Sequence, residues 1–317
     1  MKSIKILRQG MCSLDYMIDR RLHVLRMVRQ RGSVTAAAEA LYLTPSAVSQ
    51  QVRGLARDLD VELLRQEGRG VHLTPAAEVL LAHTDRLMAD WERARAELEE
   101  HRRGQVARVG LCGFPSALAA LLPDVVAQLR TDPELRVEVV QADPAECLDR
   151  LVAGTSDLAI LEATRVVPST VDERFEVQEL FDDSLWLVVP LDHGWAGAAE
   201  ARLEDAVGEG WVCGPPGGSY HQIELDACRR AGFEPRIVHR AVDWSAYLAI
   251  VRAGLGVALM PGLAIPADAA VARVRLADTP RQSRRVLTCV RRGSGHHPAI
   301  HRLREALERA YPRPPGG

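Results

Sequence analysis

The segment 33–59 limits the fold of this chain more than any other, because it predicts two helices joined by a tight turn. The first helix, about residues 34–41, is rich in alanine, and small side chains let two helices pack closely at a large crossing angle. Thr44 can cap the second helix, and Pro45 takes its first position, where the missing N–H costs nothing. An amphipathic helix is predicted just before, at 18–30. Together they predict a compact three-helix unit.

The helix that begins at Pro45 has two different faces. Apolar side chains at spacings of four, three and four residues are predicted to point inward: Val48, Val52, Leu55 and Leu59. Short hydroxyls, an amide and arginines point outward: Ser46, Ser49, Gln50, Arg53 and Arg57. Hydroxyls and glutamine can bond base edges, and arginine can reach guanine or phosphate. A solvated face is the alternative, but the short helix and tight turn before it favour the major groove of DNA.

The charge is distributed unevenly although the whole chain carries only −2. Residues 1–75 sum to +5, residues 76–103 to −2, and residues 104–317 to −5. A small basic unit on an acidic remainder indicates a polyanion as partner of the N-terminal part.

The stretch 33–81 resembles the winged helix-turn-helix of LysR-type transcription regulators. The matches include Ala37 and Ala38, the block PSAVSQQ that starts at Pro45, and Leu73-Thr74-Pro75. Asp60 stands where relatives commonly have glycine, and aspartate tolerates a turn conformation better than most residues. The resemblance implies that the third helix enters the major groove and that the wing, Leu64 to Leu73, contacts the adjacent backbone. The DNA-binding residues expected are Thr44, Pro45, Ser46, Ser49, Gln50, Arg53, Arg65 and Arg69.

A long helix is predicted to follow from Thr74 and Pro75, as a linker over 76–103. Apolar residues recur at alternating spacings of three and four, at Ala77, Leu80, Thr84, Leu87, Trp91, Ala94 and Leu98, with threonine as the one polar member. Such a heptad seam is typical of self-association, with packing on its own domain as the alternative. We expect Leu80, Leu87, Trp91 and Leu98 to make a homodimer, and the resemblance implies a homotetramer.

The remainder, 104–317, alternates short apolar strands with amphipathic helices and predicts an α/β domain with largely parallel sheets. Strands are expected at 107–111, 136–140, 158–161, 185–190, 236–240, 257–260 and 286–290, and helices at 117–130, 144–153, 220–231, 244–253 and 298–310.

Three stretches of this remainder, LLPDVVAQLRTDPELRVEVV, LDRLVAGTSDLAIL and YLAIVRAGLGVALMP, resemble the LysR effector-binding domain. That domain is similar to periplasmic binding proteins, with two α/β subdomains and a ligand cleft between them. We assign subdomain I to about 106–180 plus 267–310 and subdomain II to about 181–266.

In such folds a ligand sits where strands end and helix N-termini offer unpaired N–H groups. The expected effector contacts are Pro115, Ser116, Glu162, Gly217, Ser219, Asp243 and Trp244. Each also has a plain reading as a helix cap or turn residue. Glu162 argues against a strongly anionic effector.

The overall interpretation is a winged helix-turn-helix at 17–75, a linker helix and an effector domain, in a cytoplasmic regulator that binds an operator. Residues 1–16 fit a disordered extension or an artefact of start-codon choice. The chain shows no nucleotide-binding or hydrolase motif, no signal peptide and no membrane span, so we expect no enzyme, cofactor, metal site or membrane partner. RNA polymerase is a further candidate partner. The alternative is a thiol-based redox sensor that uses Cys213 and Cys228.

Overall fold

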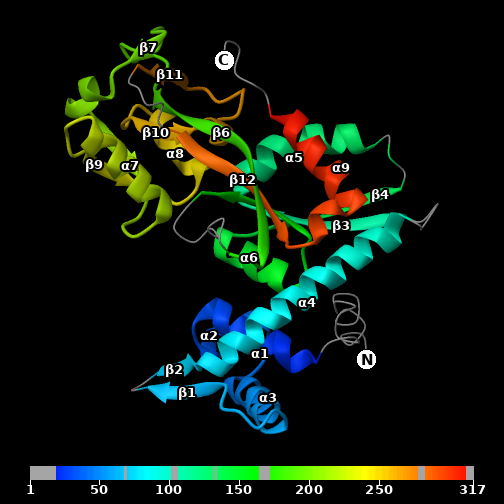
Figure 1. The fold of residues 1–317 in the computed structure, drawn as a ribbon. Helices are drawn as coiled ribbons and strands as arrows, with labels where there is room; N and C mark the ends of the chain where they lie inside the picture. The colour runs from blue at the N-terminus through cyan, green and yellow to red at the C-terminus, as the bar shows by residue number, and fades with distance from the viewer. Residues whose placement is uncertain are drawn as a thin grey trace, which may run out of the picture.

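The computed structural model describes residues 19–67, 70–100, 106–130, 132, 134–163, 172–277 and 283–311. The predicted extension at 1–16 and Arg69 lie outside the described residues. A small N-terminal domain and a long helix precede two α/β lobes (Figure 1). Within the described residues, no helix has the length and apolarity that a membrane span requires.

The N-terminal domain consists of α1 (Arg20–Arg31), α2 (Val34–Ala40), α3 (Pro45–Asp58) and a hairpin of β1 (Leu64–Glu67) and β2 (Gly70–Leu73). The predicted caps are present. Gly32 ends α1 with φ of 72°, and the hydroxyls of Ser33 and Thr44 accept hydrogen bonds from the amides of Ala36 and Ala47, at 3.1 and 3.2 Å. These local signals fix where each helix begins and ends.

The inward face of α3 was predicted correctly at three of four positions. Val48, Val52 and Leu55 are buried, whereas Leu59 is 46% exposed. The prediction for Leu59 is wrong because α3 ends at Asp58, and Asp60 then adopts φ of 51°, the turn conformation expected for it.

The long helix α4 (Pro75–Glu100) connects the N-terminal domain to the lobes (Figure 1). Its first half buries Ala77 and Leu81 in the core of the N-terminal domain. Its second half lies against the first lobe, where Ala89 and Glu92 are buried.

The first lobe is built on the strands β3 (Ala107–Gly113), β4 (Leu135–Gln141) and β5 (Leu158–Glu162), which pair in parallel in the order β4-β3-β5. Two longer strands, β12 (Ser283–Arg291) and β6 (Phe175–Val189), extend this sheet in antiparallel pairing. Buried residues of α5 (Pro115–Leu129) and α9 (Pro298–Ala310) share one core with Val109 and Leu111, and α6 (Pro144–Ala153) shares the other with Cys112. The sheet is thus covered on both faces.

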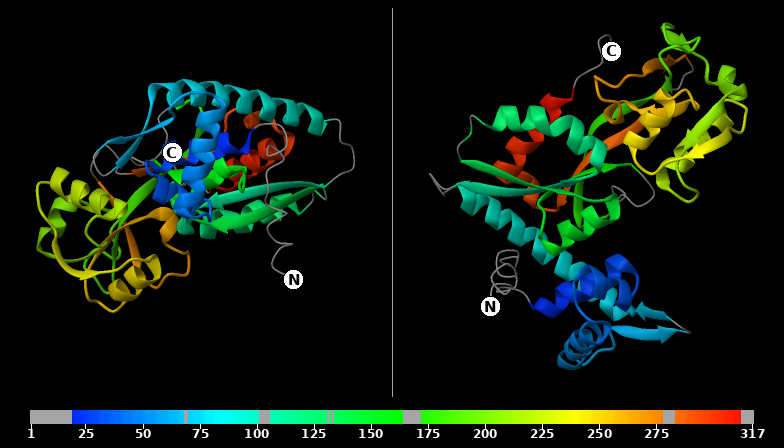
Figure 2. Two further views of the ribbon diagram at one scale, coloured as in Figure 1. Left: turned by 90° about the horizontal axis from the view of Figure 1, so that it is seen from below. Right: turned by 180° about the vertical axis from the view of Figure 1, so that it is seen from behind.

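The second lobe begins where β6 leaves β12. The end of β6 pairs with β10 (Ala258–Pro261) and β11 (Ala272–Leu276), and β11 also pairs with β7 (Glu200–Ala201). A separate parallel pair consists of β8 (Gly210–Cys213) and β9 (Arg236–Arg240). The helices of this lobe are α7 (Ser219–Arg230) and α8 (Trp244–Arg252), with short 3-10 helices at Leu203–Gly208 and Gly262–Ala264, and a third at Ser294–His296 in the first lobe. Figure 2 shows the two lobes side by side, joined by the long strands.

The predicted α/β class of residues 104–317 is confirmed. The five helices predicted there begin and end within two residues of α5, α6, α7, α8 and α9. The expectation of largely parallel sheets is wrong for the long strand β6, which pairs antiparallel with β10, β11 and β12, and for β12, which pairs antiparallel with β5. The subdomain boundary near residue 267 is also wrong. Ala272 and Val274 of β11 are buried in the core of the second lobe, so the chain returns to the first lobe only at β12.

Candidate functional site

The outward face of α3 is open in this structure. Gln50, Arg53 and Arg57 are exposed, and among the described residues none of the three makes a hydrogen bond or ion pair. Together with Ala56, Asp60, Val61 and Glu62 they line an open groove of about 600 Å³. Free donors on a rigid helix suit base edges and phosphates.

The N-terminus of α3 brings further predicted residues to the same surface. Thr44, Pro45 and Ser46 are exposed and Ser49 is half-buried. The hydroxyl oxygens of Thr44 and Ser46 lie 3.0 Å apart. On the wing, Arg65 is exposed and donates to Glu62 at 2.9 Å, so this arginine would have to exchange that carboxylate for a phosphate.

The predicted dimer residues divide along α4. Leu87 and Leu98 are 57% and 62% exposed. Leu80 packs partly against the core of its own domain, where Ala77 is buried, and the buried hydroxyl of Thr84 donates to the Leu80 carbonyl at 2.8 Å. Trp91 is half-buried, and its indole Nε1 has no hydrogen-bond partner among the described residues. The first half of the seam thus serves its own domain, and the second half leaves apolar side chains exposed.

In the first lobe, Ser116 and Glu162 meet around a residue that the sequence did not single out, Arg284 of β12. Its guanidinium donates to the Ser116 hydroxyl at 2.8 Å and to Glu162 at 3.1 Å, and its Nε donates to Asp183 at 2.9 Å. The same guanidinium lies 4.8 Å from the centroid of the Phe114 ring. All five side chains are buried.

The charges of Asp183 and Arg284 act on each other in this cluster. Burial raises the pKa of Asp183, although Arg284 and the Leu263 amide act in the opposite direction. The register of β12 and β6 places Arg284 directly opposite Asp183. The two acid groups Asp182-Asp183 and the arginines Arg284-Arg285 were the available sequence signal, but 101 residues separate Asp183 from Arg284.

In the second lobe, Trp244 packs edge-on against Tyr220, with ring centroids 4.6 Å apart. Tyr220 in turn lies near Arg284 and Asp183, whose charges act on its pKa, and burial raises that pKa above the usual range. Its hydroxyl donates to the Leu259 carbonyl of β10 at 2.9 Å, so Tyr220 holds Trp244 against the core of the second lobe. Sequence reasoning missed it because tyrosine at the start of a helix has no distinctive pattern.

The other predicted effector residues occupy more ordinary positions. Asp243 is the N-cap of α8 and accepts from the Ala246 amide at 2.9 Å. Gly217 is an exposed turn residue with φ of 84°, and Ser219 is the first residue of α7. Pro115 is exposed at the start of α5 and lines an apolar groove along that helix.

The second lobe also contains a buried acidic residue, Glu224. Glu224 of α7 is 1% exposed and accepts from the Gly214 amide and the Tyr247 hydroxyl, both at 2.9 Å. Burial raises its pKa to about 7, against the opposing effect of those two donors and Arg240. His221 is also buried and its Nδ1 lies 3.8 Å from a Glu224 oxygen.

The five cysteines within the described residues are all buried in the lobes. Cys213 and Cys228 are both buried in the second lobe, and burial raises the pKa of Cys228 to about 12 and that of Cys213 above its usual range. A thiol of this kind is a poor nucleophile at neutral pH. Among the described residues, no group of His, Cys, Asp and Glu has metal-binding geometry.

Family models match most of the chain. The model described as bacterial regulatory helix-turn-helix protein, lysR family, matches residues 20–78, and the LysR substrate binding domain matches residues 102–312.

Among curated relatives, the transcriptional dual regulator GltC of Bacillus subtilis is 30% identical over 247 residues, which covers 76% of this chain and 80% of that protein. A probable hydrogen peroxide-inducible genes activator of Streptomyces viridosporus is 29% identical over 281 residues, covering 86% and 88%. Among solved structures, a full-length OxyR variant of Pseudomonas aeruginosa has a TM-score of 0.61 at 20% identity and covers 92% of this chain and 94% of its own. Full-length CbnR complexed with its target DNA has a TM-score of 0.54 at 24% identity, covering 93% and 100%.

Proposed function

This chain belongs to the LysR family of DNA-binding transcription regulators, and from that premise we propose that α3 and the wing read a double-stranded operator. The observation that carries the proposal is the outward face of α3, on which Gln50, Arg53 and Arg57 are exposed and have no hydrogen-bond or ion-pair partner in the part of the chain that the structure describes. Thr44, Ser46 and Arg65 would add contacts to the backbone on either side. Phosphate contacts would set the register, and Gln50 and Arg53 would provide sequence discrimination.

We also propose that a small-molecule effector binds between the lobes, beside Ser116, Arg284, Tyr220 and Trp244. Arg284 is already matched by the two carboxylates of Glu162 and Asp183, so the cluster has no free positive charge for a strong anion. A neutral or weakly polar molecule with an aromatic or apolar part fits these surroundings best, because Tyr220 and Trp244 offer ring faces.

The remaining assignments follow from these two. We assign the protein a regulatory role without enzymatic activity, in the cytoplasm, where it would meet the operator and RNA polymerase. Leu87, Trp91 and Leu98 would join two copies along α4, and two dimers would make a tetramer. Redox sensing through Cys213 and Cys228 is the less favoured function, because both thiols are buried with raised pKa values.

The DNA-binding proposal is tested on full-length protein at fixed salt. We expect Gln50→Ala and Arg53→Ala each to weaken specific operator binding by about 1–3 kcal/mol, because each removes contacts to the DNA without touching the core. Arg230→Ala, an exposed arginine in the second lobe, is the matched control and should bind as the wild type does. Unchanged operator affinity in both α3 variants would refute the assignment.

A further inference from the structure

The N-terminal domain contacts the first lobe of its own chain directly, in addition to the covalent connection through α4. Helix α1 lies against α6, and one continuous cluster of buried apolar residues extends from the N-terminal domain into the α6 side of the first lobe. Val28 of α1 and Leu148 and Leu151 of α6 are members of that cluster. The DNA-binding domain is therefore packed on the effector domain, not merely tethered to it.

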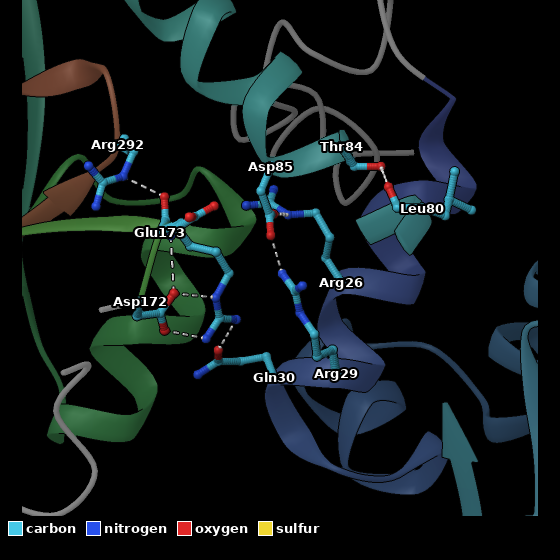
Figure 3. A network of polar contacts seen from close by, with 10 residues as sticks. Arg26, Arg29, Gln30, Leu80, Thr84, Asp85, Asp172, Glu173 and Arg292 are labelled. Carbon is cyan, nitrogen blue, oxygen red and sulfur yellow. Dashed lines mark hydrogen bonds and ion pairs between the residues drawn. The ribbon is translucent and has the colours of Figure 1, made fainter. Parts of the chain in front are cut away.

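Ion pairs and hydrogen bonds lie beside the apolar contact between α1 and α6. Arg31 at the end of α1 forms an ion pair with Asp149 of α6. Next to it, Gln30 accepts a hydrogen bond from Arg174 at 2.6 Å, and Arg174 is held in turn by Asp172 at 2.7 Å (Figure 3). The polar contacts thus join α1 of the N-terminal domain to α6 and to the segment that precedes β6.

On its other side α1 is fixed to α4. Arg26 and Arg29 both form ion pairs with Asp85, and Arg26 and Asp85 are buried (Figure 3). Further along α4, Glu92 accepts from Arg291 of β12 at 2.6 Å, with both side chains buried.

Helix α1 is thus held in place by both α4 and the first lobe. Because α3 packs on α1, the orientation of α3 relative to the first lobe depends on these contacts. Helix α3 lies on the side of the N-terminal domain away from α6 (Figure 1), and Gln50, Arg53 and Arg57 remain exposed, so the contact orients the recognition helix without covering it.

This contact includes one buried carboxylate, that of Asp149. Asp149 is only 6% exposed, and among the described residues neither of its carboxylate oxygens has a hydrogen bond of regular geometry. Burial raises its pKa to about 6, with the charge of Glu146 acting in the same direction and Arg31 against both. A buried charge with a single, partly exposed partner costs free energy.

We propose that the α1–α6 contact is a reversible joint, which sets the direction of the recognition helix and opens without unfolding either domain. Its consequence at the operator rests on the proposed function. The joint itself exists or fails in the absence of DNA, so the two are tested separately.

Hydrogen exchange of the full-length protein, read on peptides from α1 and α6, tests the joint. Arg31→Ala leaves Asp149 buried without its cation and should raise exchange in both helices about tenfold. Asp149→Asn removes the buried charge and should keep exchange at or below the wild-type rate. Gln30→Ala removes one hydrogen bond and should act in the same direction as Arg31→Ala, by about threefold. Arg229→Ala, which breaks an exposed ion pair in the second lobe, is the control and should change neither helix.

Unchanged exchange in Arg31→Ala and Gln30→Ala would overturn the proposal, as would opening of the joint by Asp149→Asn. An unfolded Arg31→Ala, recognised by denaturant titration, leaves Gln30→Ala to decide. In a second experiment, operators with altered half-site spacing are titrated with each variant. An opened joint should tolerate spacings that the wild type rejects. A wild type that binds no operator would refute the DNA-binding function and leave the exchange result standing.

Discussion

At the scale of single residues, Arg284 connects more of the proposed effector site than any residue that the sequence predicted for it. It bonds Ser116 of α5, Glu162 of β5 and Asp183 of β6. Ser116 is the second residue of α5 and Phe114 is the N-cap, so the reading of Ser116 as a simple helix cap does not apply. Its hydroxyl serves Arg284 instead.

Arg284→Met should lower the free energy of unfolding by about 3–5 kcal/mol, because two carboxylates would remain buried without a cation. The loss should shrink as the pH falls, since burial already raises the pKa of Asp183 and protonation removes the uncompensated charge. Denaturant titration at two pH values measures both effects. The neighbouring Arg285, exposed and paired with Glu179, is the matched control, and Arg285→Ala should cost at most about 1 kcal/mol. Equal losses in the two variants would contradict this role of Arg284.

Ser116→Ala tests the effector contact. The substitution removes one hydrogen bond to a charged group, worth about 1.5–3 kcal/mol of stability, and should abolish the effector response while operator binding persists. Reporter transcription with and without candidate metabolites, together with thermal unfolding, measures both. A normal response in Ser116→Ala would move the search to Ser219 and Trp244.

At the scale of elements, α4 has two different tasks along its length. Its N-terminal half completes the core of the DNA-binding domain with Ala77 and Leu81, and its second half is fixed to the first lobe through Glu92. Helix α4 packs closely on the first lobe at Gly293, where a Cβ atom would lie 2.2 Å from the Ala89 carbonyl oxygen. In this second half, Leu87 and Leu98 are exposed and would be available to a second copy.

Leu87→Glu places a charge in this half of α4 and should dissociate the oligomer to monomers without unfolding them, since Leu87 is 57% exposed in the single chain. Sedimentation velocity measures the assembly, and the monomer should also lose affinity for an operator with two half-sites. Leu255→Glu, a matched change at an exposed leucine in the second lobe, should leave the assembly intact. If Leu87→Glu has the same oligomeric state as the wild type, the assignment of Leu87 to the dimer seam is wrong.

At the scale of the whole molecule, the lobes and the DNA-binding domain are held together by buried charged groups as well as by apolar cores. Arg291 is one example, since it bonds Glu92, Asp157 and two carbonyls. Within the second lobe, burial raises the pKa of Glu224 to about 7, which places its titration close to neutral pH. Global stability should therefore depend on pH in a range where ordinary carboxylates do not titrate.

For Glu224 the sign follows from a folded-state pKa that lies above the ordinary value of 4.5. The folded state then binds the proton more tightly, so the free energy of unfolding should fall as pH rises from about 4.5 to about 7, by up to about 3 kcal/mol. Glu224→Gln should remove this part of the pH dependence, which denaturant titration across that range measures. An unchanged slope in the variant would show that Glu224 titrates normally. Glu234→Gln, at an exposed surface pair, is the control.

The sequence by itself determined the DNA-binding domain, because its signals act over a few residues. Ser33 and Thr44 cap amides three residues away, and the faces of α3 follow from its own periodicity. Tertiary structure decided the contacts between residues that lie far apart in the chain. Arg284 meets Ser116 across 168 residues of chain, and α1 meets α6 through side chains that look like ordinary surface charges in sequence. Such partners depend on strand register and domain packing, which arise from the sum of many weak contacts and leave no local pattern.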